Sequence, residues 1–165
     1  MSNEGKMNIN WYPGHMAKTK RQIIDDLKVI DVVIELLDAR IPLASKNPDF
    51  DNLIKNKKRI IVLNKADLTD MNENKKWIEY FAQKGIPALA VDSNSGRGIE
   101  KVTKEIEKIM QPELEKLQAK GIVRKTIRVM ILGIPNVGKS SFINRIAKKT
   151  TMEVGNRPGV TRQKQ

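Results

Sequence analysis

The sequence of 165 residues contains no cysteine, a single histidine and few aromatic side chains. Without cysteine the chain can form neither disulfide bonds nor thiolate metal sites. No apolar run approaches the roughly eighteen residues needed to cross a bilayer, and no secretory signal precedes the first apolar segment. We therefore expect a cytoplasmic protein with no membrane partner. Aromatic residues make up 4% of the chain, which disfavours RNA recognition by base stacking.

Basic residues strongly outnumber acidic ones. The chain has 31 Lys and Arg residues against 19 Asp and Glu, a net charge of +12. This surplus favours a polyanionic partner, although a well-solvated basic surface also explains it. If the partner is RNA, its contacts should be mainly to phosphates and sensitive to salt. The basic turn at residues 55–59 has the same two explanations, of which we favour the solvated edge.

Residues 133–140, with the sequence GIPNVGKS, match the phosphate-binding loop pattern G-x-x-x-x-G-K-[ST]. A short apolar, β-branched run at 126–132 precedes the loop and predicts a buried strand, and apolar residues at helical spacing follow it. Such a loop wraps backbone N–H groups around phosphates at a helix N-terminus. Lys139 adds a positive charge, the Ser140 hydroxyl can ligate magnesium, and a side chain at Gly138 would crowd the phosphates.

A second motif, Asn64-Lys65-Ala66-Asp67, follows the predicted buried strand at 60–63. Ligands of open α/β sheets bind at the carboxyl ends of the strands. The ionised carboxylate of Asp67 only accepts hydrogen bonds, so it can accept from the ring N1–H and the exocyclic amine of guanine. Adenine lacks this pair of donors. The Lys65 stem can lie over the base, and Asn64 can tie this loop to the phosphate loop.

Apolar periodicity predicts alternating strands and helices along the chain. The strands are expected at 32–37, 60–63, 88–91 and 126–132, and the helices at 15–28, 48–56, around 77–85, 99–110 and 139–149. Pro112 is expected to kink or restart the helix that begins at Ile99 before it ends near Gly121. The alternation predicts an α/β fold, with a mostly parallel sheet and helices on both faces, in one domain over residues 1–165.

The ends of the chain and its histidine carry weaker signals. Residues 1–10 are polar and expected to be flexible. Residues 150–165 lack periodicity, although Thr161, which follows Pro-Gly, could ligate magnesium and sense a γ phosphate. His15 lies at a predicted helix start, where a histidine is more often a cap or a packed side chain. The loop at 92–96 could meet the guanine carbonyl, but taken alone it is typical of an ordinary turn.

The order of the motifs is informative, because NKAD precedes GIPNVGKS, whereas ordinary small GTPases have the phosphate loop first. Joining the termini of such a domain and opening it elsewhere preserves the sheet. From Trp11 to the C-terminus the chain resembles the circularly permuted GTPases of the ribosome biogenesis GTPase A family. The segments WYPGHMAK, DARIP, NKADL, GIPNVGKSS and GNRPGVT are similar to the family's landmarks and stand in the family's order. The resemblance implies a three-layer P-loop NTPase fold in a circularly permuted GTPase domain.

The resemblance also implies roles for individual residues. Guanine recognition would fall to the NKAD motif and to the loop after the third strand, and the phosphates to the phosphate loop and the C-terminal segment. The implied nucleotide-binding residues are Asn64, Lys65, Asp67, Ser93, Asn136, Val137, Gly138, Lys139, Ser140, Ser141, Gly159 and Thr161. Ser140 and Thr161 would ligate magnesium, and Asn136 would hold a potassium ion. His15 would be the catalytic histidine, because the family lacks the usual water-positioning glutamine, and its near-neutral pKa suits that role.

By resemblance, the protein would bind GTP and GDP and hydrolyse GTP during late assembly of the large ribosomal subunit, with hydrolysis coupled to release. Its partners would be the subunit precursor and its rRNA, and it would be monomeric off the ribosome. The family continues past the switch threonine into a D-x-P-G element and a helical domain, whereas this sequence stops at Gln165. We therefore expect a truncated domain with weak nucleotide binding and slow or no turnover. The alternatives are a P-loop ATPase or kinase, and a basic rRNA-binding module that senses nucleotide without turnover.

Overall fold

A single sheet of five strands forms the centre of the computed structural model, which describes residues 7–11, 17–122, 126–133 and 137–150. The strands are β1 (Met7–Trp11), β2 (Val32–Asp38), β3 (Lys58–Asn64), β4 (Ala88–Ala90) and β5 (Ile127–Leu132). They lie in the order β1-β5-β2-β3-β4, and every neighbouring pair is parallel. The predicted α/β fold with a parallel sheet is therefore confirmed.

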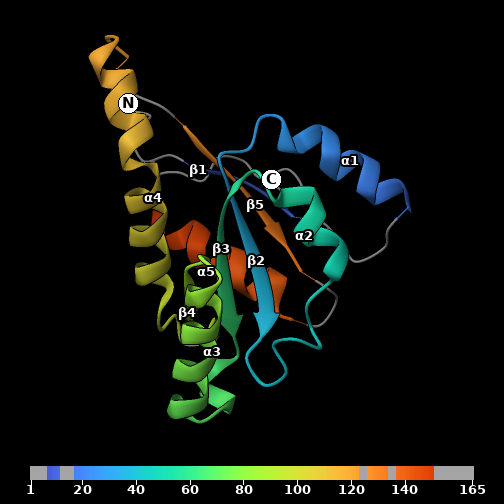
Figure 1. Cartoon of the computed structure of the whole chain (residues 1–165). Helices are drawn as coiled ribbons and strands as arrows, with labels where there is room; N and C mark the ends of the chain where they lie inside the picture. Colours follow the sequence, from blue (N-terminus) through green and yellow to red (C-terminus); the bar gives the residue numbers. More distant parts are fainter. Residues whose placement is uncertain (1–6, 12–16, 123–125, 134–136, 151–165) are drawn as a thin grey trace.

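Helices cover both faces of this sheet, as the sequence predicts. They are α1 (Ala17–Leu27), α2 (Pro48–Ile54), α3 (Met71–Gln83), α4 (Ile99–Ala119) and α5 (Lys139–Thr150), with a short 3-10 helix, η1 (Ala66–Leu68), after β3. Figure 1 shows α1 and α2 on one side of the sheet and α4 on the other. No helix in the described ranges is long and apolar enough to cross a membrane.

The core divides according to the alternation of side chains along the strands. Val32, Ile34 and Leu36 of β2 face α4 and α5, in the largest apolar cluster. Val33 faces the other way and packs in a cluster with residues of α1 and α2, and Leu37 packs in a third cluster with residues of α3. The fold therefore has three layers, with α1, α2 and α3 opposite α4 and α5.

The structure differs from the sequence expectations at two places. The N-terminal segment predicted to be flexible contains β1, which pairs in parallel with β5 from Met7 opposite Ile127 to Trp11 opposite Ile131. Its regular structure comes from this long-range pairing at the edge of the sheet, where a strand need not carry the apolar pattern of a buried one. Residues 1–6 lie outside the described ranges.

The second concerns Pro112, which does not restart the helix. α4 runs without interruption from Ile99 to Ala119 with Pro112 inside it. Proline lacks the N–H that would bond to the carbonyl of Lys108. Both Pro112 and Lys108 lie on the exposed side of the helix, where water can replace the lost bond. Met110 and Leu114 on the inner side continue the apolar packing across this point.

Candidate nucleotide-binding site

Three loops meet at the edge of the sheet where the strands end. One follows β3, one follows β4 and one follows β5, and these strands all run in the same direction. A pocket of about 180 Å³ opens between the loops. Its lining residues are Asn64, Lys65, Asp67, Leu68, Asp92, Ser93, Asn94, Gly138 and Ser141. The structure thus brings residues of both sequence motifs and of the 92–96 loop into one pocket.

Asn64 connects these three loops. Its side chain is almost fully buried, with 2% of the residue exposed. The Nδ2 atom donates a hydrogen bond of 2.8 Å to the carbonyl oxygen of Val137. The Oδ1 atom accepts one of 2.7 Å from the Ser93 hydroxyl. The prediction that Asn64 ties its loop to the phosphate loop is confirmed, and the same side chain also holds the loop after β4.

Lys65 and Asp67 are presented by a sharp turn at the end of β3. Lys65 has a left-handed backbone with φ of 64°, and η1 begins immediately after it. A hydrogen bond of 3.0 Å from the Ala66 N–H to the carbonyl of Val91, the residue after β4, fixes this turn. Asp67 is exposed, so its carboxylate is accessible from solvent at the mouth of the pocket. An accessible acceptor at this position suits the recognition of hydrogen-bond donors on a ligand.

The phosphate loop needs glycine at position 138 for a reason beyond the one that the sequence suggests. Gly138 has φ of +86°, a conformation that side chains rarely adopt. A Cβ atom there would also lie 2.5 Å from the Nδ2 atom of Asn64. A side chain would therefore displace Asn64 and break the link between the loops, in addition to crowding any bound phosphate.

Lys139 begins α5 and is buried, with 8% of the residue exposed. Its ammonium group donates a hydrogen bond of 2.6 Å to the carbonyl oxygen of Gly133, at the other end of the loop. Burial, which removes water from the charged group, lowers the pKa of Lys139 to about 8. Ser140 and Ser141 follow in the first turn of the helix and are exposed. The helix therefore starts with a buried cation and two accessible hydroxyls.

Sequence reasoning missed Arg145, a residue of α5 that contacts the loop after β4. Its Nε atom donates a hydrogen bond of 2.8 Å to the Ser93 carbonyl, and its terminal nitrogen donates to the Asn94 carbonyl. These bonds cross 52 and 51 positions in the sequence, and no local pattern marks them. Arg145 therefore links α5, the helix after the phosphate loop, directly to the loop that carries Ser93.

Asp38, at the end of β2, is a second residue that the sequence did not single out as a site residue. It accepts hydrogen bonds from the Arg40 guanidinium at 2.9 and 2.7 Å, which hold the pKa of the Asp38 carboxyl below its usual value. Lys65 also lies close to this carboxylate, with its Nζ atom 3.7 Å from Asp38 Oδ2. The carboxylate therefore attracts the lysine of the NKAD motif toward the end of β2. DARIP and NKAD, noted separately in the sequence, lie side by side.

Four of the predicted site residues fall outside the described part of the chain: His15, Asn136, Gly159 and Thr161. The described ranges contain no group of three or more His, Cys, Asp or Glu side chains that could hold a metal ion. The predicted roles of these four residues in catalysis, phosphate binding and metal binding stay predictions.

The comparisons with known proteins agree with this geometry. Residues 128–165 match the family model of the 50S ribosome-binding GTPases. The chain is 47% identical over 159 residues to ribosome biogenesis GTPase A of Bacillus licheniformis, covering 96% of this chain and 56% of that protein. Identity to the protein of the same name from Bacillus cereus is 48%, over 96% of this chain and 54% of the relative. The chain thus spans about half the length of these relatives.

Solved structures of a protein named YlqF are also similar to this chain. The crystal structure of GNP-bound YlqF from T. maritima superposes with a TM-score of 0.58 and 32% identity, over 87% of this chain and 50% of that one. The GDP-bound structure of the same protein gives a TM-score of 0.56 and 33% identity, over 78% and 48% of the two chains. Nearly all of the 165 residues therefore match ribosome biogenesis GTPase A proteins, over about half of the length of those proteins.

Proposed function

We propose that this chain is the guanine-nucleotide-binding part of a GTPase that acts in late assembly of the large ribosomal subunit. The observation that carries the proposal is the pocket in which Asn64 joins the NKAD loop, the Ser93 loop and the phosphate loop. Relatives named ribosome biogenesis GTPase A support the ribosomal context. Hydrolysis of GTP to GDP and phosphate would drive release from the subunit precursor.

The chemistry of the pocket favours guanine over adenine. Asp67 supplies an exposed carboxylate that can accept two hydrogen bonds from the N1–H and the exocyclic amine of the base. Lys65, held near Asp38, can place its aliphatic stem over the ring. The phosphates would then extend toward the N-terminus of α5, where backbone N–H groups and Lys139 favour negative charge. A ligand spanning both parts must contain a guanine base and at least one phosphate.

The metal and catalytic roles follow from the family resemblance and complete the proposal. Ser140 fits a magnesium ligand, since its hydroxyl is exposed in the first turn of α5 directly after the phosphate-loop lysine. Thr161 would be a further magnesium ligand and Asn136 would hold potassium. Magnesium, when bound, would neutralise charge that develops on the phosphates. His15 would orient or deprotonate the attacking water.

The partners proposed for this protein are the precursor of the large ribosomal subunit and its rRNA, met in the cytoplasm, and the protein would be monomeric away from the ribosome. The net charge of +12 supports an RNA partner.

Substitution of Asp67 by Asn tests the guanine site. The Asn side chain offers an N–H donor where Asp offers only acceptors, so it should reject the exocyclic amine of guanine and donate a hydrogen bond to the carbonyl that xanthine carries at the same position. We expect Asp67→Asn to weaken GDP binding by roughly 10²–10⁴-fold, the value of two hydrogen bonds to a charged group. Binding of XDP should strengthen. Fluorescence titration with labelled GDP and XDP measures both affinities.

Asp70→Asn is the matched control, because Asp70 lies three residues further on and only caps α3 through the N–H of Asn72. It should leave the preference for GDP over XDP unchanged. Equal loss of GDP binding in both variants, or displacement of GDP by ATP, would contradict the assignment of a guanine site. Phosphate release from GTP, measured on the same chain, separates a GTPase from a module that only senses the nucleotide.

A further inference from the structure

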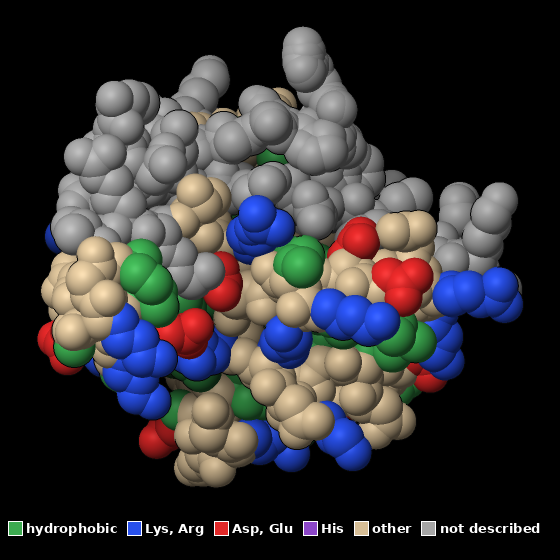
Figure 2. All heavy atoms as spheres, turned by 90° about the horizontal axis from the view of Figure 1, so that it is seen from above, with side chains coloured by type: hydrophobic (Ala, Val, Ile, Leu, Met, Phe, Trp, Pro, Cys, Tyr) green, Lys and Arg blue, Asp and Glu red, His purple; other side chains and the backbone are tan. Residues whose placement is uncertain are grey.

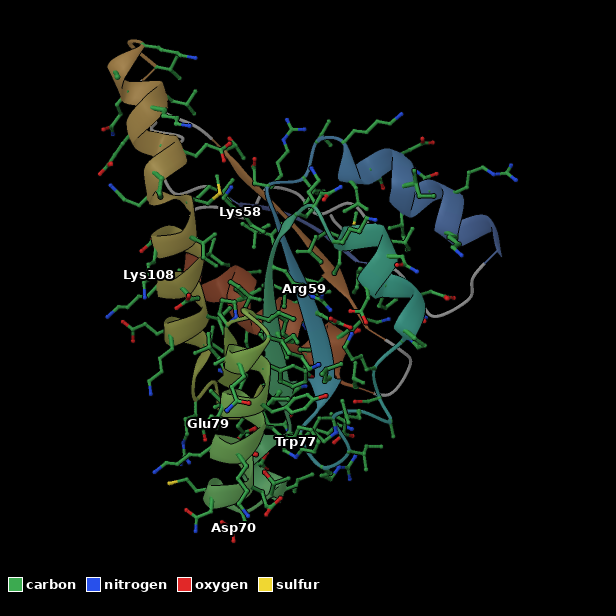
Figure 3. All side chains as sticks on the ribbon, in the orientation of Figure 1. Lys58, Arg59, Asp70, Trp77, Glu79 and Lys108 are labelled. Carbon is green, nitrogen blue, oxygen red and sulfur yellow. The ribbon has the colours of Figure 1, made fainter. Side chains whose placement is uncertain are left out.

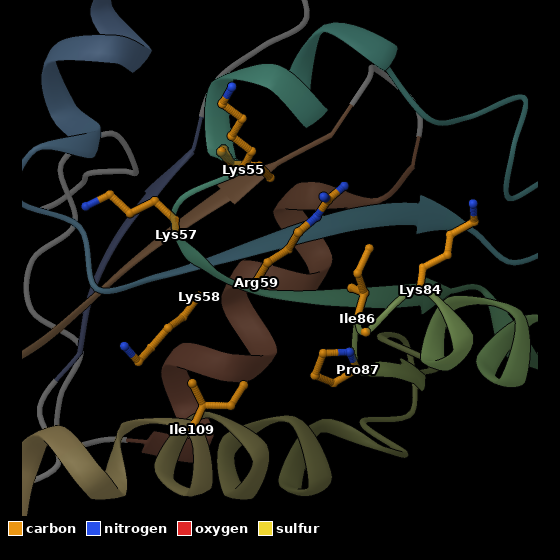
Figure 4. Close-up of a pocket in the computed structure, with 10 residues that line it drawn as sticks. Lys55, Lys57, Lys58, Arg59, Lys84, Ile86, Pro87 and Ile109 are labelled. Atoms are coloured by element: carbon orange, nitrogen blue, oxygen red, sulfur yellow. The ribbon is translucent and has the colours of Figure 1, made fainter.

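A basic groove lies where β3 begins, at the opposite end of the strand from the nucleotide loops. It has a volume of about 450 Å³ and is formed by the end of α2, the start of β3, the turn after α3 and the middle of α4 (Figure 4). Its cationic lining residues are Lys55, Lys57, Lys58, Arg59 and Lys84. The floor is apolar and includes Ile86, Pro87 and Ile109. No Asp or Glu is among the described residues that line it.

Part of this positive charge is already balanced. The Arg59 guanidinium contacts Glu35 Oε1 and Asp51 Oδ1, each at 2.5 Å. Lys46 pairs with the same two carboxylates. These two cations and two anions form a neutral group next to the groove.

The positive charge that is not balanced by carboxylates belongs to the lysines that line the groove. Lys58 lies 3.3 Å from Glu113, and both side chains are more than 40% exposed, so this pair is weak. Lys57 donates to the Ile30 carbonyl at 3.0 Å, and this partner is uncharged. Within the described ranges Lys55 and Lys84 form no ion pair, and Lys84 lies 5.1 Å from the centre of the Tyr80 ring. Lys55, Lys57 and Lys84 therefore leave the groove with an uncompensated positive charge.

We infer that this groove binds the phosphates of an RNA backbone. In Figure 4 the labelled lysine side chains point apart from one another around the apolar floor. Separated ammonium groups match charges that repeat along a chain better than they match one small anion. Ammonium groups also bind as point charges, whereas Arg59, the groove's guanidinium, is already engaged by carboxylates. The groove therefore favours the repeated phosphates of RNA over the planar carboxylates of an acidic protein, and the apolar floor can carry the ribose.

The groove continues into a second hollow, which shares Lys57 and Lys58 with it. That hollow, of about 440 Å³, is lined by Lys28 but also by Asp31 and Glu113. Its charge is mixed, so the surplus belongs to the first hollow. The shared residues give an extended ligand a continuous path rather than a closed site.

The position of the groove separates RNA binding from nucleotide binding. β3 runs seven residues from Lys58 to Asn64, a length of about 20 Å. Figure 3 shows Lys58 in the upper half of the view and Asp70, which follows the NKAD loop, at the bottom of the molecule. In Figure 2, a view onto the end where β2 and β3 begin, Lys and Arg side chains spread over the surface with acidic ones between them. RNA in the groove would leave the nucleotide site open. The basic turn at 55–59, expected to be a solvated edge, is thus assigned to the RNA contact.

The test replaces the three surplus lysines together, as Lys55→Gln, Lys57→Gln and Lys84→Gln. Binding of a fluorescent 20-nucleotide oligo(U) to the chain is measured as a function of KCl concentration. Each phosphate contact in single-stranded RNA contributes about 0.7 to the slope of log affinity against log salt, so loss of three contacts should reduce that slope by about 2. At low salt, on the order of 50 mM, the affinity should fall roughly a hundredfold.

The control carries the same charge change elsewhere, as Lys75→Gln, Lys101→Gln and Lys116→Gln on exposed faces of α3 and α4. It should retain most of the slope and affinity, and equal losses in the two triple variants would overturn the proposal. A second experiment adds polyglutamate of the same charge as a competitor of the labelled oligo(U). If polyglutamate competes as strongly as unlabelled RNA does, the proposal of an RNA site is overturned in favour of an acidic protein partner.

The inference rests on the proposed function only for the identity of the RNA as ribosomal. GDP binding, measured on the same groove variant, should be unchanged, which also shows that the variant is folded. Failure of the unsubstituted chain to bind GDP would reject the proposed function and leave the groove result standing.

Discussion

Lys139 shows how one buried charge can make nucleotide binding depend on pH. Its ammonium group is enclosed by the phosphate loop and bonded to the Gly133 carbonyl. Burial penalises the charged form and lowers the pKa of Lys139 to about 8. Phosphates beside the ammonium group would favour the charged form again, so binding above this pH must take up a proton. Affinity for nucleotide should therefore fall as pH rises through the pKa of the free protein.

We expect the affinity for GDP to fall about fourfold between about pH 7 and pH 8.5, because Lys139 loses its proton in the free protein over this range. Calorimetric titration in buffers of different ionisation enthalpy measures both the affinity and the proton uptake. In Lys139→Arg the cation does not titrate in this range, so the remaining affinity should not change with pH. The same pH dependence in both proteins would show that another group is responsible.

The residues of the site differ in how far sequence can predict them. Asn64 and Gly138 belong to motifs with fixed spacing, and a motif after a buried strand predicts where its side chains lie. Arg145 carries no such mark, because its partners are backbone carbonyls of a loop 52 positions away. Every residue has a backbone carbonyl, so the sequence does not indicate which carbonyls accept hydrogen bonds from Arg145. The structural reason for glycine at 138 was missed in the same way, because it depends on the approach of Asn64.

At the scale of elements, β2 contains a charged residue in a fully buried strand. Glu35 is 0% exposed and lies on the same face as Val33 and Leu37, which pack in separate clusters beneath different helices. Arg59 and Lys46 reach Glu35 at 2.5 and 3.3 Å. The ion pairs of Glu35 therefore lie between two apolar clusters, one packed under α1 and α2 and the other under α3.

We expect Glu35→Gln to lower the free energy of unfolding by roughly 3–5 kcal/mol, because it removes the buried anion that both cations face. Urea denaturation measures the change. Asp51→Asn is the control, since Asp51 bonds the same two cations but its side chain is 50% exposed, and it should cost about 1 kcal/mol or less. A cost for Glu35→Gln no larger than that of the control would show that the buried carboxylate does not hold these elements together.

Elements with an apolar pattern are predictable from this sequence, and those fixed by pairing are not. β2 and β5 were expected within a residue of their observed bounds, since both consist largely of buried apolar residues. β3 begins two residues earlier than expected, at Lys58, because pairing with β2 extends it through charged residues. β1 was missed altogether, since only its partner β5 makes it a strand.

At the scale of the whole molecule, the nucleotide site joins segments that are far apart in the chain. Asn64 bonds to Val137 across 73 positions, and Arg145 bonds to Ser93 across 52. The phosphate loop comes last in the sequence, yet β5 lies between β1 and β2 in the sheet. A ligand that touches all three loops binds only when these segments are folded together. Its binding should therefore stabilise the entire domain rather than one loop.

Arg145→Met tests whether this assembly depends on the bridge between α5 and the loop after β4. Because the guanidinium holds the Ser93 and Asn94 carbonyls, its loss should weaken GDP binding about tenfold. At a fixed excess of GDP, the stabilisation by ligand then falls by about 1.4 kcal/mol, and the rise in Tm caused by GDP shrinks by roughly 3–5 °C. Differential scanning fluorimetry with and without GDP measures this difference. Arg128→Met, at an exposed position of β5, is the control and should keep the full rise in Tm. A full rise in Arg145→Met would mean that Asn64 alone suffices to join the loops.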